Sequence, residues 1–341
     1  MRKSILGALI SSAFAVAGPA HAGLILDLDG AGGLAPVEVT ALDWSQTSFL
    51  AQNGNQAIAN FNAGSGSTEF QVYTHAKLTG YTLAGTNSSI SLPSGFGEIT
   101  MVASYTERVV SSDPTGAANG GNPTAGFRST GAGWLEFYYD PTPNASDLTG
   151  SGFNDGVLIG RLSGVAANVF GNFTVDSLAP LSVLDGFGAD QYAGQQTVTG
   201  SGSQGKLQVG TSGVSLDAAF FITTLTGFFL DYQNISIGLP FGTTDPSDCF
   251  NTTQNGGALG TSSASTCDAS HQAANYAGQV NGSGYTPNVG PVNGLGLGSP
   301  DFVAQTDFNS AVNGVPEPGT LALVGLALGT AGFAASRRRR S

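Results

Sequence analysis

Apolar and polar residues alternate along several short stretches of this chain. A period of two predicts β-strands, because successive side chains of a strand point to opposite faces. The clearest stretch covers residues 69–83, where apolar residues from Phe70 to Leu78 share one face. His75 falls on the other, polar face, so we expect a surface imidazole there. Weaker alternation or compact apolar runs predict further strands at residues 99–110, 134–139, 157–162, 218–232 and 235–239.

Tracts rich in Gly, Asn, Ser and Thr separate these runs and predict turns. They lie at residues 113–126, 150–152, 200–205 and 251–266. Short strands joined by such turns predict an all-β fold, an antiparallel β-sandwich-like domain. A β-solenoid is the alternative, although the sequence contains no clean repeat of fixed period that would favour it.

The first residues have the pattern of a secretory signal peptide. Positive charge at Arg2 and Lys3 precedes an apolar run that is too short to span a membrane comfortably, and a small-x-small cleavage pattern ends at Ala22. We therefore expect residues 1–22 to be removed on export and the mature chain to begin at Gly23.

The C-terminal residues 315–341 combine three features in a fixed order. A Pro-Glu-Pro triplet comes first, an apolar stretch from Leu321 to Ala335 follows, and a basic cluster comes last. The triplet consists of Pro316, Glu317 and Pro318, and the cluster of Arg337, Arg338, Arg339 and Arg340. With the two residues before it, the apolar stretch is just long enough for a transmembrane helix, and arginines accumulate on the cytoplasmic side of such helices. This predicts a body outside the cell membrane and a tail inside it.

Together these three features resemble the PEP-CTERM sorting signal. In that family an exosortase, a membrane-embedded cysteine protease, recognises and cuts the tail. The resemblance implies exosortase as a processing partner and a transient inner-membrane intermediate held by the C-terminal helix. It further implies delivery to the cell surface or the extracellular matrix. The signal specifies an address and not an activity.

The body between the two signals divides by composition. We expect a β-rich secreted domain at residues 23–280 and a flexible spacer, rich in Gly, Asn and Pro, at residues 281–314. The chain has 11 basic residues, of which six lie in the terminal signals, and 23 acidic residues, of which one does. The body therefore keeps five basic and 22 acidic residues, and its net charge is −17. Such a charge repels nucleic acid and anionic membranes, so we expect neither as a partner of the mature protein.

The chain contains two cysteines, Cys249 and Cys267. In an oxidising compartment we expect a disulfide between them, which stabilises the fold by about 3 kcal/mol in the chain-entropy description. A metal site would need more ligands, and only His271 and a few acids lie near in sequence. His271 is also the one nearby group that could activate a nucleophilic cysteine.

Sequence motifs for catalysis or cofactor binding are missing. No His-Glu-x-x-His, nucleophile elbow, phosphate loop or dinucleotide fingerprint occurs, so we expect no catalytic residue, no metal and no cofactor. The run Asp27-Leu28-Asp29-Gly30 resembles the opening of a calcium loop, but the later ligands fail and a hairpin turn is expected instead. Aspartates from Asp140 to Asp190 lie beside turn-forming residues, which keeps a glycosidase open only as an alternative.

Trp134 and Tyr138 are the candidate sugar contacts, because aromatic rings can stack on sugar rings. The glycine-rich body, the segment from Leu148 to Gly160 and the late Phe-rich strand are similar to flocculation-associated PEP-CTERM proteins. That resemblance implies a role in holding cells together in flocs or biofilms with exopolysaccharide. We therefore expect a non-enzymatic surface or matrix protein. The alternatives are a secreted carbohydrate-active enzyme and a carbohydrate- or calcium-binding module.

Overall fold

The computed structural model describes most of the body of the chain. The described residues are 23–45, 47–86, 88–118, 120–145, 152–175, 200–204, 207–209, 214–237, 259–260 and 302–314. Nearly all of their regular structure is β-strand, and one helix, α2 (Gly54–Ala63), lies among them. The strands are β1 (Leu24–Leu26), β2 (Val37–Trp44), β3 (Thr47–Gln52), β4 (Glu69–Leu83), β5 (Ser89–Ser91), β6 (Glu98–Asp113), β7 (Thr124–Asp140), β8 (Val157–Ser163), β9 (Phe170–Val175), β10 (Gly200–Gln204), β11 (Leu207–Val209), β12 (Ser215–Leu216), β13 (Leu225–Ile237) and β14 (Phe302–Gly314).

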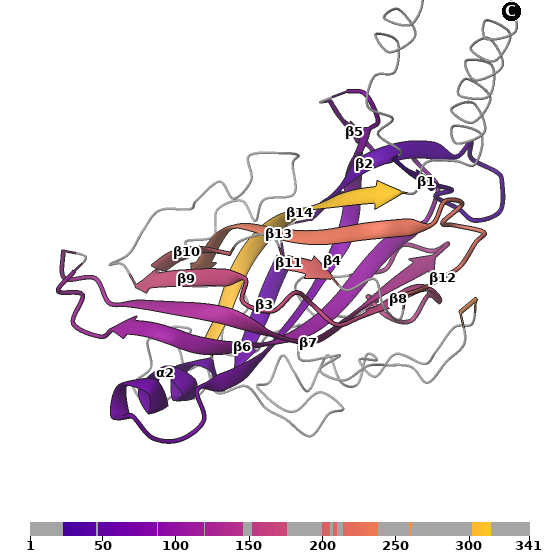
Figure 1. Cartoon of the computed structure of the whole chain (residues 1–341). Coiled ribbons are helices and arrows are strands. Elements are labelled where there is room, and N and C mark those ends of the chain that lie inside the picture. Colours follow the sequence, from indigo (N-terminus) through magenta and orange to yellow (C-terminus); the bar gives the residue numbers. More distant parts are fainter. Residues whose placement is uncertain are drawn as a thin grey trace, which may run out of the picture.

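These strands form one curled antiparallel sheet, which Figure 1 shows, and the all-β antiparallel prediction is confirmed. The order is β1-β2-β14-β3-β4-β6-β7-β9-β10-β13-β11, with β5 on β4, β8 on β7 and β12 on β8. β13 also pairs with β14, so the sheet curls back on itself. What the sequence predicted as the layers of a sandwich are, in the described residues, parts of this single sheet.

Strand β14 corrects the predicted domain boundary. It pairs with β13 on one side and with β2 and β3 on the other, so Phe302–Gly314 is an inner strand and not part of a flexible spacer. Burial alternates along the end of this strand: Ser310 and Val312 are buried, and Asn309 and Ala311 are partly exposed. Among the four residues of β14 whose burial is described, one of the two buried positions carries a polar serine, so apolar alternation does not mark the strand.

Aromatic side chains fill the core and connect strands that are distant in sequence. The fully buried Trp44 stacks against Phe137 with ring centroids 5.9 Å apart, and Phe137 meets Phe228 edge-on at 5.2 Å. The Trp44 Nε1–H group donates a hydrogen bond of 2.8 Å to Ser310 Oγ, 266 residues further along the chain. Because an unpaired buried donor is costly, this bond explains why a serine occupies an inward position of β14.

Most of the predicted strands are found. Strand β4 has the predicted bounds, and residues 99–110, 134–139 and 157–162 lie within β6, β7 and β8. Residues 218–232 and 235–239 overlap β13, which begins only at Leu225, and residues 218–220 form a turn instead. By contrast, residues 200–204 were predicted as a turn and form β10, which pairs with both β9 and β13. Its Gly and Ser residues contribute backbone hydrogen bonds but no apolar pattern that would reveal a strand.

Several predicted segments lie outside the described residues, namely the signal peptide, residues 281–301 of the spacer, Cys249, Cys267 and the tail from residue 315 onward. Predictions about them therefore stay predictions. Within the part of the chain that the structure describes, no helix is both long enough and apolar enough to cross a membrane.

Candidate functional site

The sheet formed by β4, β6, β7 and β8 has two different faces. One face packs into the aromatic core, and the other carries polar side chains and only a small apolar cluster of Val102, Tyr138, Phe153 and Leu158. Registers between strands place Lys77 opposite Thr100 and Thr100 opposite Tyr138 on this second face. We call it the polar face. It carries most of the buried titratable groups described below.

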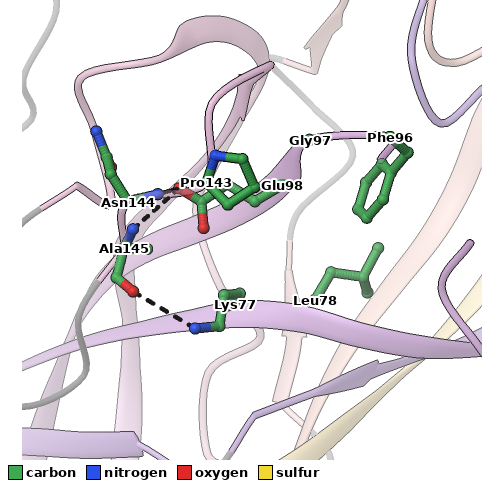
Figure 2. A pocket seen from close by; sticks show the side chains of 8 residues that line it. All are labelled: Lys77, Leu78, Phe96, Gly97, Glu98, Pro143, Asn144 and Ala145. Carbon is green, nitrogen blue, oxygen red and sulfur yellow. Dashed lines mark hydrogen bonds between the residues drawn. The ribbon is translucent and has the colours of Figure 1, made fainter. Parts of the chain in front are cut away.

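A pocket of about 400 Å³ opens at one end of the polar face, where the segment that follows β7 folds back over β4 and β6. Figure 2 shows its walls. They consist of Lys77, Leu78, Phe96, Gly97, Glu98, Pro143, Asn144 and Ala145. One side of the pocket is apolar and the other carries an ammonium and a carboxyl group, so it suits a small polar molecule with an apolar face.

Glu98 fixes the segment that covers this pocket. Its side chain is 3% exposed, and its Oε1 accepts hydrogen bonds from the backbone N–H groups of Asn144 at 2.6 Å and Ala145 at 2.9 Å. Lys77 Nζ donates to the carbonyl oxygen of Ala145 at 3.4 Å (Figure 2). Burial raises the pKa of the Glu98 carboxyl, although the two N–H groups and the charge of Lys77 act in the opposite direction.

A second polar cluster lies further along the polar face. Glu136 is fully buried, accepts a hydrogen bond of 2.9 Å from Arg161 Nε, and accepts another of 2.7 Å from the Tyr138 hydroxyl. The register pairs Glu136 directly with Arg161 on β8. Both oxygens of the carboxylate are therefore used, which is what a buried charge requires.

His75 corrects a sequence prediction. It was expected at the surface, yet it is 0% exposed and its ring lies against Phe153, with centroids 4.2 Å apart. Burial, together with the smaller effect of the nearby positive charge of Lys77, lowers the pKa of His75 to about 3. The imidazole is therefore neutral near pH 7. The alternation in β4 correctly separates two faces, but it cannot reveal that the segment around Phe153 covers the second one.

The two candidate sugar contacts lie in different environments. Tyr138 is buried and its hydroxyl is bonded to Glu136, so its ring offers no face to a sugar. Trp134 is half-buried and packs against the small apolar cluster of the polar face. The placement of Tyr138 therefore contradicts its predicted role, whereas a sugar contact at Trp134 stays a prediction.

Residues 27–30, which resemble the opening of a calcium-binding loop, lie between β1 and β2. These two strands pair as a hairpin. Asp27 accepts hydrogen bonds from the N–H groups of Asp29 and Gly30, and Asp29 accepts from those of Ala31 and Leu34. The carboxylates thus stabilise turns, and the loop is longer than a two-residue Asp-Gly turn. No group of three or more His, Cys, Asp or Glu side chains in the described ranges is arranged to hold a metal ion.

Sequence reasoning missed Lys77 and Glu98 as pocket residues. Lys77 occupies a polar position inside the predicted strand 69–83 and Glu98 precedes the predicted strand 99–110, and neither position is a signal for a pocket by itself. The decisive information is the return of residues 143–145 over these strands, and that return follows from backbone hydrogen bonds to Glu98 rather than from a motif.

Comparison with known proteins identifies one segment of the chain. The family model described as the PEP-CTERM protein-sorting motif matches residues 314–340. The match starts at the last residue of β14 and includes the Pro-Glu-Pro triplet, the apolar stretch and the arginine cluster. No curated protein and no solved structure matches the chain.

Proposed function

We infer that the chain, which carries a PEP-CTERM sorting motif, is a secreted protein that exosortase processes at the membrane and that is bound for the cell surface. From this premise we propose that it is a non-enzymatic surface or matrix protein, which supports flocculation and biofilm adhesion by binding exopolysaccharide. The observation that carries the proposal is the position of the motif, directly behind an inner strand of a folded polar domain.

The composition of the body supports an adhesive role. Charged residues make up only 10% of the chain, and Gly alone accounts for 51 of its residues. Amide and hydroxyl groups on such a surface can form many weak hydrogen bonds to a hydrated polysaccharide. Many copies on one cell convert weak contacts into strong overall attachment without any tight individual site.

The buried carboxyl groups of the polar face are engaged in structural contacts, which also supports a non-catalytic role. Glu98 holds the N–H groups of Asn144 and Ala145, and Glu136 is bonded to Arg161 and Tyr138. A general acid or base must instead be within reach of a substrate proton. The alternative of a carbohydrate-active enzyme draws its support from the raised pKa of Glu98 beside a pocket.

The proposal includes the steps of export. The signal peptide at residues 1–22 is removed, the tail holds the chain in the inner membrane, and exosortase then releases the body to the surface or matrix. A disulfide joins Cys249 and Cys267 after export. Intact-mass measurement of the secreted protein and peptide mapping without reductant check these steps, and a secreted form that retains Arg337–Arg340 or two free thiols contradicts them.

Gene deletion followed by complementation tests the adhesive function. Cells without the gene should clump less while they make normal amounts of polysaccharide, and the full chain should restore clumping. A variant that lacks residues 316–341 should be secreted without sorting and should fail to restore it. Normal clumping of the deletion strain, together with glycan hydrolysis by the purified protein that Glu98→Gln abolishes, would replace this proposal with the enzyme.

A further inference from the structure

Two arginines lie side by side at the opposite end of the polar face from the pocket. Arg108 on β6 is directly opposite Arg128 on β7, and Arg128 is directly opposite Phe170 on β9. In the sheet of Figure 1, β7 lies between β6 and β9. Like charges that face each other across a sheet destabilise the strand pair. Their presence therefore calls for an explanation other than fold stability.

A single residue holds both guanidinium groups in place. Arg128 Nη1 donates to the backbone carbonyl oxygen of Asn168 at 2.7 Å, and Arg108 Nη2 donates to its side-chain oxygen Oδ1 at 3.3 Å. Asn168 has a φ of 66°, a backbone conformation that asparagine tolerates better than most residues. The loop that contains it is fixed to β7, because Ser129 accepts the N–H of Asn168 and its Oγ accepts the N–H of Val169.

An exposed aromatic ring completes this arrangement. Phe170 is 44% exposed, and the Arg128 guanidinium carbon lies 5.5 Å from the centre of its ring. Gly126 makes room for the ring, since a Cβ at that position would lie 3.0 Å from one of its carbon atoms. The ring and the two guanidinium groups therefore present one continuous surface to solvent.

The two arginines of this pair have only uncharged hydrogen-bond partners among the described residues, in Asn168. Arg161 forms an ion pair with Glu136, and Lys77 bonds to a carbonyl oxygen beneath the covering segment. Arg108 and Arg128 have no carboxylate within 4 Å among the described residues, and Glu69, which lies opposite Arg108 on β4, forms no ion pair with it. The mature chain has a net charge of −17 and only five basic residues, and two of these five lie together at this site.

We infer that Arg108, Arg128 and Phe170 form a binding site for a carboxylate-bearing polysaccharide, that is, a chain of uronic acid residues. Each guanidinium can bind a carboxylate through two parallel hydrogen bonds, and the phenyl ring can stack on the apolar face of the sugar. The negative charge of the rest of the protein disfavours nucleic acid, whose charges are far denser. The inference rests on the proposed function and names the chemistry of its polysaccharide partner.

Binding of the secreted protein to polygalacturonate, measured by calorimetry beside neutral dextran and duplex DNA, tests the inference. We expect binding to polygalacturonate that weakens as salt is added, and at least a tenfold loss in the double variant Arg108→Gln, Arg128→Gln. The double variant with lysine at both positions keeps the charge without the planar fork and should lose less. Glu69→Gln should bind more tightly, because it removes a carboxylate beside the site.

Arg161→Gln is the matched control, since it makes the same Arg-to-Gln change at a guanidinium that is paired with Glu136, and it should bind as the unaltered protein does. Unchanged binding by the double glutamine variant, equal loss in Arg161→Gln, or preference for DNA would each overturn the inference. Thermal unfolding confirms that each variant is folded.

Flocculation separates this inference from the proposed function. If deletion of the gene abolishes clumping but the double glutamine variant restores it fully, the arginine site is wrong and the adhesive function stands. If the deletion strain clumps normally while the purified protein still binds polygalacturonate through the arginines, the site stands and the adhesive function is wrong.

Discussion

The two ends of the polar face differ in whether their charged groups are buried or face solvent, although strands β6 and β7 form both ends. At the end with Glu98 and Glu136, both carboxyl groups are buried and accept hydrogen bonds within the protein, Glu98 through Oε1 and Glu136 through both oxygens. At the other end, Arg108 and Arg128 face solvent and are held by the uncharged Asn168. Burial forces a charge to find an internal partner, whereas exposure does not. Fold stability therefore explains the first end, and recognition of something outside the protein explains the second.

Acidic pH should have the largest effect on the stability of the fold, and it should act through the buried His75. Its pKa is about 3 in the folded protein and 6.5 in a model peptide, so between these values the unfolded chain binds a proton more readily than the folded one. The free energy of unfolding should therefore fall as the pH is lowered from 6.5 towards 3, by about 1.4 kcal/mol per pH unit at the steepest. Urea denaturation at several pH values measures this slope.

His75→Gln is the control, because it removes the titrating group and should flatten the curve. Glu98 acts in the opposite sense: burial raises the pKa of Glu98 above 4.5, so the stability that its protonated form provides is present below that pH and is lost as the pH rises. The difference between the two curves isolates the histidine. Equal slopes in both proteins would show that the imidazole is accessible to water in the folded state.

Replacement of Glu136 should produce the next largest effect. Glu136→Ala removes the carboxylate that accepts hydrogen bonds from the Arg161 guanidinium and the Tyr138 hydroxyl. We expect the free energy of unfolding to fall by about 2 kcal/mol, below the usual value for a buried pair because Arg161 is 30% exposed. Glu136→Gln keeps one acceptor oxygen and should cost less. Chemical denaturation of both variants measures the difference, and equal losses would mean that the charge contributes nothing beyond shape.

The smallest effect is expected at the exposed end. Arg108→Ala removes a like charge opposite Arg128, so the free energy of unfolding should stay within about 0.5 kcal/mol and should rise rather than fall. Arg161→Ala makes the same chemical change at the buried end and should destabilise the fold clearly. A loss from Arg108→Ala as large as that from Arg161→Ala would remove the distinction between the two ends.

The fold could be predicted where apolar alternation marks a strand, and not where polar residues replace it. The bounds of β4 follow from such alternation, because its inner face must enter the core. Strands β10 and β14 could not be recognised in this way, since Gly, Ser and Asn occupy many of their positions. Their place in the sheet depends on pairing with distant strands, as the bond between Trp44 and Ser310 illustrates.

The polar face shows a similar limit. The sequence separates its residues from the core face correctly, but whether they are buried depends on a covering segment that pattern cannot place, so His75 was expected at the surface and Tyr138 at a sugar site. The sequence pattern also could not predict that Arg108 and Arg128 lie directly opposite each other. Their pairing depends on the strand register, which is shifted by an irregularity between Tyr105 and Glu107. The sorting signal, by contrast, is a linear motif and needs no fold to be recognised.

The position of β14 has a mechanical consequence. Its final residues lie beside β2 near Ala41, which in turn pairs with Thr82 at the far end of β4, whereas Arg108 pairs with Glu69 at the start of β4. At the usual rise of a strand, about 40 Å of sheet separates the two points. Tension between a polymer bound at Arg108 and the C-terminal end of the released body at the cell surface would run along the strands and across hydrogen bonds perpendicular to them. Those bonds would be loaded together in shear rather than opened one at a time, which is the arrangement that best resists pulling.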